Sequence, residues 1–386
     1  MTVITDSKIL KERLKPLFDE EFITVDTEFL REKTFYPLLC LIQVAGAHDA
    51  FAIDPLAAKL DMEPFYKLMQ DKNVLKVMHA CEQDMEIMLQ ESGKLPKPVV
   101  DTQVAAQVLG YGESMGYGNL VEKLCGVSLD KSSRHTDWSK RPLTRKQIDY
   151  AISDVTHLYG VYQHILEELE DKGRTAWLEE EMEPFRDPKN YQTEPEDAWK
   201  KLKLRGGKGP YLAVVQELAH WRELRARQID KPRSWVLKND GILEIASHMP
   251  ERIEQLDGLR YYSNRDRALS EEILKVVKKG IKSKPPEFEK PQVLPKSASS
   301  LMDLMRVLLK AQSAQHDVSP SIVASADELE QVVLLKHPEQ DKELRCMHGW
   351  RYDVFGKYAL KLKAGGLALT VDKNRILLIE PAYSEE

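Results

Sequence analysis

The chain has 386 residues, of which 42% are hydrophobic and 31% charged, and its mean hydropathy is -0.44. These values exclude a disordered chain and a membrane protein, since no run approaches the roughly 18 uninterrupted apolar residues of a membrane span. Asp6 interrupts the segment in which a secretory signal would be apolar. We therefore expect a cytoplasmic protein of two or three domains, because a single core stops growing at about 250–300 residues.

Charge is distributed unevenly along the chain. Residues 1–199 contain 23 Lys and Arg against 36 Asp and Glu, whereas residues 200–284 contain 20 against 11. The basic block is the better platform for a polyanion, because phosphate binding releases condensed cations. The acidic half would need bound cations before it approached a phosphate. Four cysteines stand without any C-x-x-C spacing, so we expect reduced, mostly buried thiols rather than a zinc site or a disulfide framework.

The first half alternates strand-like and helix-like segments, which is typical of an α/β fold with a mostly buried sheet. We predict strands over residues 22–29, 38–44, 50–53 and 74–78 and one ending at Asp101, with helices over 62–70 and 81–91 and directly after Asp101. Thr144 opens a capping box, and apolar residues then recur at helical spacing toward Leu169. This pattern places Tyr150 and Asp154 on one helix.

The second half shows mainly helical periodicity, in two blocks separated by residues 283–297. That segment contains four prolines and is typical of a linker. We therefore predict an α/β domain over residues 1–175, a small all-α domain over 205–284 and a second helical domain over 298–386. Within the last domain, residues 367–371 and 376–379 flank Asp372-Lys373-Asn374 as a hairpin.

Four acidic residues of the first half form a pattern. Asp26 and Glu28 are two apart on a strand and therefore share a face, although a strand end meeting solvent would explain the pair as well. Asp84 lies in the first turn of a helix, where acids are common because of the helix dipole. Asp154 follows Tyr150 by four residues, so the two side chains share a helical face. A partly buried tyrosine beside a solvated acid would explain this spacing as well.

Together these acids indicate a metal site. Four carboxylates in one place would repel one another and raise some pKa values unless cations neutralised them. An all-oxygen ligand set favours Mg²⁺ or Mn²⁺ over zinc or copper. Two such ions about 4 Å apart can activate a water and stabilise the departing oxygen of a phosphoryl displacement.

The segments around these acids resemble the three exonuclease motifs of the DEDD superfamily, in its tyrosine-containing branch, and more closely those of the ribonuclease D family. The resemblance covers about residues 15–170 and rests on Val25-Asp26-Thr27-Glu28-Phe29, Tyr36-Pro37, Leu41-Ile42-Gln43, His79-Ala80, Asp101-Thr102-Gln103, Thr136-Asp137-Trp138, Arg141-Pro142-Leu143 and Tyr150-Ala151. It implies a ribonuclease H-like exonuclease domain. It also implies a 3′–5′ exoribonuclease that removes nucleotides one at a time from RNA 3′ ends by two-metal-ion hydrolysis.

The same resemblance implies a role for each residue of the pattern. Asp26 and Asp154 would ligate the ion that carries the attacking water, and Glu28 would share in that site. Asp84, together with Asp26, would hold the second ion, largely through water. Tyr150 would orient the water rather than deprotonate it, because a phenol with a pKa near 10 is a poor base at neutral pH.

Several basic and aromatic residues are candidates for RNA contacts. His79 precedes the second motif, where it could touch the terminal nucleotide, although a histidine at a strand end is often structural. Arg134 and Arg141 could contact the phosphate backbone, with ordinary surface charge as the alternative. We interpret Gln43 as a support of the sheet.

Residues 205–284 are similar to the HRDC module, a small helical domain found beside ribonuclease D exonucleases and in RecQ-type helicases. Arg225, Arg227, Arg233 and Trp235 interleave phosphate-pairing and base-stacking side chains, as single-strand RNA binding requires. The alternative is a solvated basic face with the tryptophan in the core. The last third would be a second HRDC-like domain by the same resemblance, with an unassigned hairpin.

Two rival functions stay open at this point. A 3′–5′ exonuclease acting on single-stranded DNA would use the same two-metal chemistry, because nothing in the motifs detects a 2′-hydroxyl. A catalytically decayed nucleic-acid-binding scaffold is the second rival, although all four acids and Tyr150 are present. The resemblance favours RNA with a free single-stranded 3′ end, precursor tRNA first and other small stable RNAs next, and we expect a monomer.

Overall fold

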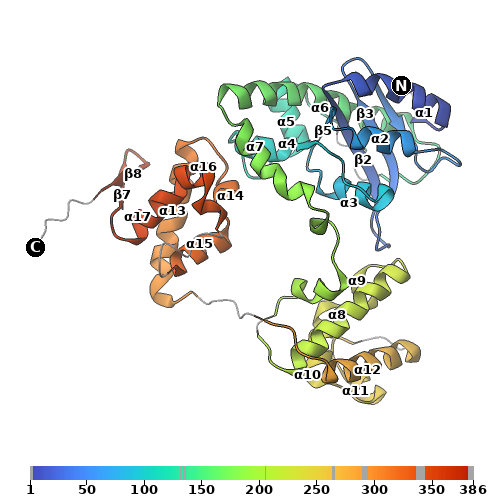
Figure 1. The fold of residues 1–386 in the computed structure, drawn as a ribbon, viewed down its shortest axis with the longest axis vertical. Coiled ribbons are helices and arrows are strands. Elements are labelled where there is room, and N and C mark those ends of the chain that lie inside the picture. Colours follow the sequence, from blue (N-terminus) through green and yellow to red (C-terminus); the bar gives the residue numbers. More distant parts are fainter. Residues whose placement is uncertain are drawn as a thin grey trace, which may run out of the picture.

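The computed structural model describes residues 3–130, 133, 136–204, 206–262, 266–288, 294–335 and 344–380. Three units lie at the corners of a triangle (Figure 1): an α/β unit, a helical unit that follows it, and a second helical unit that ends in a hairpin. This architecture confirms the predicted fold class, an α/β domain followed by two small helical domains. Within these described ranges, no helix is long and apolar enough to cross a membrane.

The α/β unit is built on a six-stranded mixed sheet. In the order β1-β4-β3-β2-β5-β6, it contains β1 (Val3–Ile4), β2 (Phe22–Leu30), β3 (Leu38–Ala45), β4 (Ala50–Ile53), β5 (Leu75–Met78) and β6 (Val99–Asp101). Strand β3 runs antiparallel to β2 and β4, whereas β5 and β6 continue parallel to β2. Every predicted strand is confirmed within about one residue. Strand β1 was not predicted, because two residues are too short for a periodic pattern.

Helices cover both faces of this sheet. They are α1 (Ser7–Leu14), α2 (Glu63–Gln70), α3 (Glu82–Ser92), α4 (Thr102–Val108), α5 (Tyr117–Cys125), α6 (Arg145–Asp171) and α7 (Thr175–Met182), with short 3-10 turns η1 (Lys15–Asp19), η2 (Glu183–Arg186) and η3 (Pro188–Asn190). Helix α6 begins with the predicted capping box of Thr144 and Gln147. It packs across β2, β3 and β4, and the Thr24 hydroxyl of β2 donates to the Val155 carbonyl of α6 at 2.8 Å. This contact fixes the helix relative to the strand that carries Asp26.

The middle unit has a hydrophobic core of its own. It contains η4 (Pro195–Lys201), α8 (Pro210–Gln228), α9 (Arg233–Val236), α10 (Asn239–His248), α11 (Ile253–Asp257) and α12 (Arg267–Lys282). Helices α8 and α12 approach closely, since a side chain at Gly280 would come within 2.7 Å of Val214 Cα. Ala198 and Trp199 of η4 belong to this core, so the packing of the unit begins before residue 205, where the sequence pattern places its start.

The C-terminal unit is helical apart from its hairpin. It contains η5 (Lys296–Ala298), α13 (Ser299–Gln315), α14 (Pro320–Val323), α15 (Ala326–Leu334), η7 (Arg345–Met347), α16 (Gly349–Arg351), the π-helical turn η8 (Tyr352–Gly356), α17 (Lys357–Lys363), β7 (Ala368–Asp372) and β8 (Arg375–Ile379). The hairpin confirms the prediction, and both residues of its turn, Lys373 and Asn374, have positive φ as a tight hairpin turn requires. Of the predicted linker, residues 289–293 lie outside the described residues.

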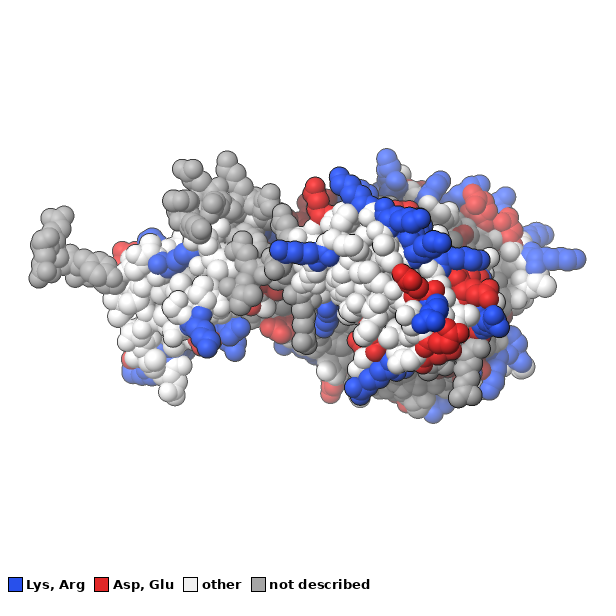
Figure 2. Space-filling model, turned by 90° about the horizontal axis from the view of Figure 1, so that it is seen from below, with Lys and Arg blue, Asp and Glu red and all other residues white. Residues whose placement is uncertain are grey.

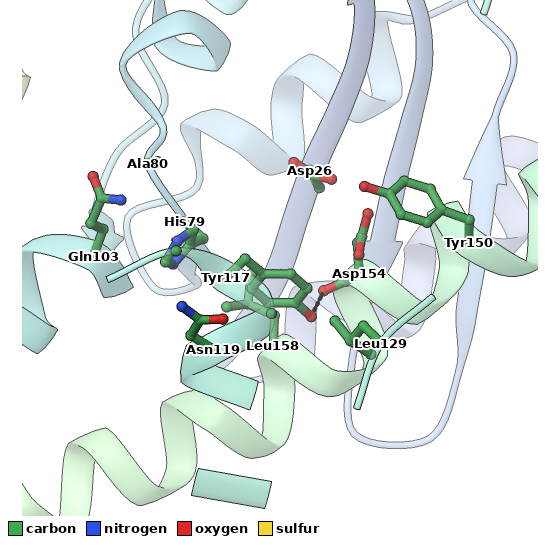
Figure 3. A pocket seen from close by; sticks show the side chains of 12 residues that line it. Asp26, His79, Ala80, Gln103, Tyr117, Asn119, Leu129, Tyr150, Asp154 and Leu158 are labelled. Atoms are coloured by element: carbon green, nitrogen blue, oxygen red, sulfur yellow. Dashed lines mark hydrogen bonds between the residues drawn. The ribbon is translucent and has the colours of Figure 1, made fainter. Parts of the chain in front are cut away.

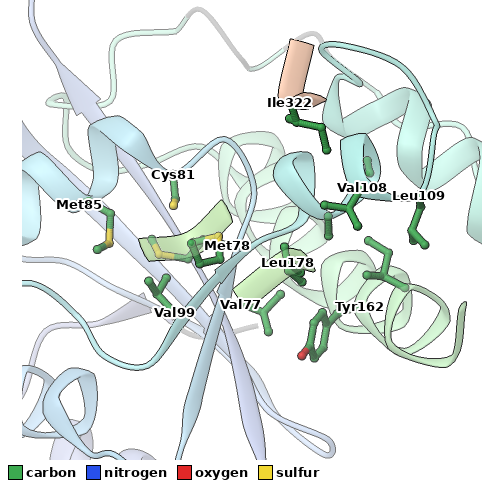
Figure 4. Packing of buried hydrophobic residues seen from close by; sticks show 14 of the residues in the cluster. Val77, Met78, Cys81, Met85, Val99, Val108, Leu109, Tyr162, Leu178 and Ile322 are labelled. Carbon is green, nitrogen blue, oxygen red and sulfur yellow. The ribbon is translucent and has the colours of Figure 1, made fainter. Parts of the chain in front are cut away.

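The C-terminal unit shares its core with the α/β unit rather than with the middle unit. Ile322 of α14 packs into the same cluster as Val108, Leu109 and Leu178 (Figure 4). Trp177 and Trp350 stack across the same boundary with their ring centroids 4.2 Å apart. The contact therefore buries large apolar groups and is an extension of the nuclease core.

Candidate metal centre and nucleotide cavity

The strand β2 carries the first two acids of the site. Thr24, Asp26 and Glu28 alternate with the buried Ile23 and Val25, so their side chains share the face on which α6 lies. Helix α6 brings Asp154 to the same place. Carboxylate oxygens of Asp26, Glu28 and Asp154 lie within 4.8 Å of one another. The structure therefore gathers these three predicted ligands into one cluster.

Asp84 approaches the cluster from the start of α3. Its side chain is buried, and one carboxylate oxygen accepts a hydrogen bond from the Thr27 hydroxyl. Burial and the nearby charge of Asp26 raise the pKa of Asp84 well above its usual value, so the two carboxylates are close enough to repel each other. The fourth predicted acid thus lies beside the cluster rather than inside it.

Asp26 is the member of the cluster that lies on β2 and lines the cavity, and its carboxyl is strongly perturbed. Burial raises its pKa from 3.8 to about 6, against a smaller opposing effect of a hydrogen bond with the Thr27 backbone. A divalent cation held by these oxygens would relieve both the burial cost and the repulsion. Carboxylate oxygens alone are the donor set that Mg²⁺ and Mn²⁺ prefer, so the residues present fit such an ion.

Tyr150 stands over the cluster, one helical turn before Asp154. Its ring lies 6.1 Å from that of Trp138, centroid to centroid. Burial, and then the charges of Asp154, Glu28 and Asp26, raise the pKa of the phenol above its usual value of 10. The hydroxyl therefore stays protonated at neutral pH and acts as a hydrogen-bond donor, which excludes it as a general base there.

A cavity of about 310 Å³ opens beside these residues (Figure 3). Asp26, Tyr150 and Asp154 line one side, and the remaining wall consists of His79, Ala80, Gln103, Gly116, Tyr117, Gly118, Asn119, Leu129 and Leu158. The hydroxyl of Tyr117 donates to the backbone carbonyl of Asp154 and so ties α5 to α6. Acidic groups thus occupy one end of the cavity, and amide and imidazole groups the other.

Comparison with known proteins decides the family. A sequence model described as 3′–5′ exonuclease matches residues 1–170, and one described as HRDC domain matches residues 211–277. Ribonuclease D of Nitrobacter hamburgensis is 42% identical over 98% of this chain and 100% of its own length, and that of Granulibacter bethesdensis is 40% identical over 98% and 96%. The chain belongs to the ribonuclease D family.

The solved structures agree with this assignment. The crystal structure of Escherichia coli RNase D, described as an exoribonuclease involved in structured RNA processing, aligns with 94% of this chain and 98% of its own length at 29% identity and a TM-score of 0.82. As a member of the ribonuclease D family, the chain is a 3′–5′ exoribonuclease. Exonucleases of this kind generally use divalent metal ions, in keeping with the acidic cluster.

His79 is the predicted RNA contact that the structure places at the cavity. Its Nδ1 is 2.9 Å from the Thr102 hydroxyl, which fixes the ring. Burial lowers the pKa of the imidazole, so the ring is neutral at physiological pH. Arg134, a second predicted contact, lies outside the described residues.

The expectation for Arg141 was wrong. Its guanidinium donates two hydrogen bonds of 2.6 Å to the carboxylate of Asp54, and its remaining N–H groups donate to the carbonyls of Cys40, Trp138 and Lys140. All of its donors are used inside the fold, where they hold the segment before α6 against β4. This arginine is structural and has no donor left for a phosphate.

Two of the predicted contacts in the HRDC domain also serve another purpose. Arg227 and Arg233 both pair with the buried Glu223, and their guanidinium groups lie 5.8 and 4.4 Å from the ring centroid of Phe35. Phe35 belongs to the loop between β2 and β3. The two arginines thus join the HRDC domain to the nuclease domain, which corrects their assignment as open RNA contacts.

The remaining two residues of that prediction stay available at the surface. The side chain of Trp235 is 59% exposed, which rules out the alternative that it fills the core. Arg225 is partly exposed and bonds only weakly, at 3.3 Å, to Gln228. Sequence reasoning missed the interdomain contact itself, in which the carboxylate of Asp230 accepts from the backbone N–H groups of Phe35 and Tyr36 at 3.0 Å.

Proposed function

We propose that this enzyme removes nucleotides one at a time from the 3′ end of RNA, with two divalent cations, Mg²⁺ or Mn²⁺, held by Asp26, Glu28, Asp84 and Asp154. The observation that carries the proposal is the cluster of three carboxylates beside the Tyr150 hydroxyl at the end of one cavity. When bound, the cations would supply an activated water and stabilise the charge of the departing 3′ oxygen. Asp26 and Asp154 would hold one ion with help from Glu28, and Asp84 would hold the other with Asp26.

The protein's own groups would position the substrate. The Tyr150 hydroxyl, protonated at neutral pH, would donate a hydrogen bond that orients the attacking water. The cavity of about 310 Å³ is at the lower end of the range for small-ligand sites, which suits a single terminal nucleotide. His79 and Asn119 line its far wall, where they would face the terminal sugar and base. Attack is then confined to the last phosphodiester, which is exonucleolytic chemistry.

The HRDC domain would bind the RNA upstream of this end. Trp235 and Tyr261, which are 59% and 43% exposed, line a hollow of about 360 Å³ together with Lys238 and Arg260. Aromatic faces beside cations bind single-stranded RNA by stacking and phosphate pairing. In the view from the side of α10–α12, lysines and arginines are interspersed with acidic side chains rather than forming one uniform field (Figure 2). Individual residues, rather than bulk charge, would therefore direct the strand.

The family supports a proposal for the class of substrate. The Escherichia coli relative is described as acting in structured RNA processing, and we propose that this chain likewise trims precursor tRNA and other small stable RNAs in the cytoplasm, as a monomer. Such RNAs end in a short single strand beyond a duplex. A cavity for one nucleotide next to a separate stacking platform suits that form of substrate.

The test uses 5′-labelled single-stranded RNA with Mg²⁺ or Mn²⁺ and the full chain. Wild type should shorten the RNA in one-nucleotide steps from the 3′ end, and chelation, Asp26→Asn or Asp154→Asn should abolish the ladder. The exposed Asp19→Asn is the matched control and should behave as wild type. A DNA oligonucleotide of the same sequence tests the rival substrate. Internal fragments, or full activity of Asp154→Asn, would refute the proposal, and binding without cleavage would favour the decayed scaffold.

A further inference from the structure

A single buried carboxylate joins the beginnings of two helices beside the metal centre. Asp101, the last residue of β6, is 2% exposed. One of its oxygens accepts from the backbone N–H groups of Ala80 at 2.9 Å and Gln103 at 2.7 Å, and the other accepts from that of Cys81 at 2.8 Å. Asp101 neither lines the cavity nor belongs to the acid cluster. Its oxygens accept from these three backbone N–H groups, and the Cys81 thiol also contacts them.

The backbone of the turn that Asp101 holds needs support from outside the turn. Ala80 has φ +54, in the left-handed region, which is unfavourable for a residue with a side chain. Cys81 is the N-cap of α3 and makes no side-chain capping bond, so the first N–H groups of the helix depend on outside acceptors. Thr102 also stabilises the turn. Its hydroxyl donates to the Met78 carbonyl at 3.1 Å and lies 2.9 Å from Nδ1 of His79.

Functional groups follow directly from this turn. Asp84 is three residues beyond Cys81, in the first turn of α3. The position of its carboxylate is therefore set by where the helix begins. His79 and Ala80 of the turn form part of the cavity wall. A change in where α3 begins would therefore move Asp84 away from Thr27 and Asp26 and reshape the cavity at the same time.

We propose that Asp101 is a positioning residue of this exonuclease: it fixes the start of α3 and thereby sets Asp84 at the distance from Asp26 that a second divalent cation requires. The inference rests on the proposed function of the acids, and it adds a residue that would touch neither cation nor RNA. Residues that orient the ligands of a metal typically change affinity or activity by 10–100-fold when they are replaced.

The primary variant is Asp101→Asn, which preserves shape but replaces one acceptor oxygen by an N–H₂ group. That group would face an N–H of the turn or of α4, so at least one of the three backbone bonds is lost. Glu328→Gln is the matched control: Glu328 is also a buried carboxylate that accepts two backbone N–H groups, from Ser325 at 2.9 Å and Cys346 at 3.1 Å, but in the C-terminal unit. Both variants weaken a buried cap, and only the first should affect the metal centre.

The readouts are Mn²⁺ binding by titration calorimetry on the full chain and the Mn²⁺ concentration for half-maximal cleavage. Asp101→Asn should weaken the Asp84-dependent binding about tenfold, raise the half-maximal concentration by a similar factor, and recover activity at high Mn²⁺. Glu328→Gln should match wild type in both. The double variant Asp84→Asn/Asp101→Asn should bind no more weakly than Asp84→Asn alone, because Asp101 acts through Asp84.

If Asp101→Asn fails to fold, Asp101→Ser separates its two tasks. Serine can still cap α4 through Gln103 but is too short to hold Ala80 and Cys81 as well, so the same loss of Mn²⁺ affinity is expected. Wild-type Mn²⁺ affinity in the folded Asp101 variants, or an equal loss in Glu328→Gln, would overturn the inference and leave the nuclease proposal intact. A wild-type enzyme that neither binds Mn²⁺ through Asp26 nor shortens RNA would instead refute the proposed function.

Discussion

Replacing Asp26 by asparagine should stabilise the metal-free protein while destroying its activity. In the folded chain, burial raises the pKa of this carboxyl from 3.8 to about 6. Keeping it ionised at neutral pH therefore costs up to about 3 kcal/mol, at 1.36 kcal/mol per pKa unit. The side chain is partly open to solvent, which reduces this figure, and we expect the variant to gain about 1–3 kcal/mol.

The sign of this effect fixes its pH dependence. A carboxyl with a raised pKa binds more protons in the folded than in the unfolded state between pH 3.8 and about 6, so the wild-type protein loses stability as the pH rises through that window. The advantage of Asp26→Asn should therefore be fully present above about pH 7 and vanish near pH 4. The raised pKa of the neighbouring Asp84 acts in the same direction, and the two groups titrate as a pair.

Thermal unfolding of the full chain in chelator, from pH 4 to pH 8, measures the difference. A change of 1 kcal/mol moves the Tm of a domain of this size by roughly 2–4 °C, so the transition of the nuclease domain should rise by several degrees in the variant. Mn²⁺ should stabilise wild type much more than Asp26→Asn, which has lost a ligand. The exposed Asp19→Asn controls for removing one negative charge. A variant less stable than wild type at pH 8, or a difference that is the same at pH 4 and pH 8, would refute the reasoning.

Three further changes probe other parts of the molecule. Tyr150→Phe should lower kcat up to about 100-fold with little change in KM. The pH profile between 6 and 9 should stay unchanged, because the raised pKa of the phenol lies above that range. Steady-state kinetics on a short RNA measures both effects. Phe35→Ala should reduce kcat/KM about tenfold on a long RNA but not on a dinucleotide, since it loosens the HRDC domain, with the more exposed Phe18→Ala as control. Arg351→Met should cost about 3 kcal/mol in urea unfolding, because the buried Glu181 loses its buried ion-pair partner and keeps only the more exposed Arg345, at 3.7 Å.

Most of the nuclease fold is predictable from the sequence because its signals are local. Strand alternation around Asp26 and the capping box at Thr144 each depend on a few neighbouring residues, and both are present as predicted. The convergence of β2, α3 and α6 is not local. It was expected only because the motifs resemble a known family, and the structure places three of the acids in one cluster with Asp84 beside it.

Arginines were the least predictable residues, for a physical reason. A guanidinium has five donors and suits a carboxylate, a carbonyl, an aromatic face or a phosphate equally well, so its sequence neighbours do not reveal its partner. Arg141 finds Asp54, 87 residues away, and Arg233 finds Glu223 and Phe35. Trp235, by contrast, is as exposed as its proposed RNA contact requires.

The loop between β2 and β3 connects the HRDC domain with the candidate metal centre. At its beginning, Arg31 directly follows Leu30, the last residue of β2, and pairs with Glu86 of α3 at 2.6 Å. The loop therefore holds the helix that carries Asp84. In the middle of the loop, Phe35 packs against Ala226 and Val236 of the HRDC domain, and the guanidinium of Arg233 lies over its ring. A shift of that domain would thus be transmitted to Asp26 and Glu28 through their own strand and to Asp84 through Arg31. Domain docking and metal-site geometry share one short segment, and loosening it should impair the cleavage of long substrates before the fold itself is lost.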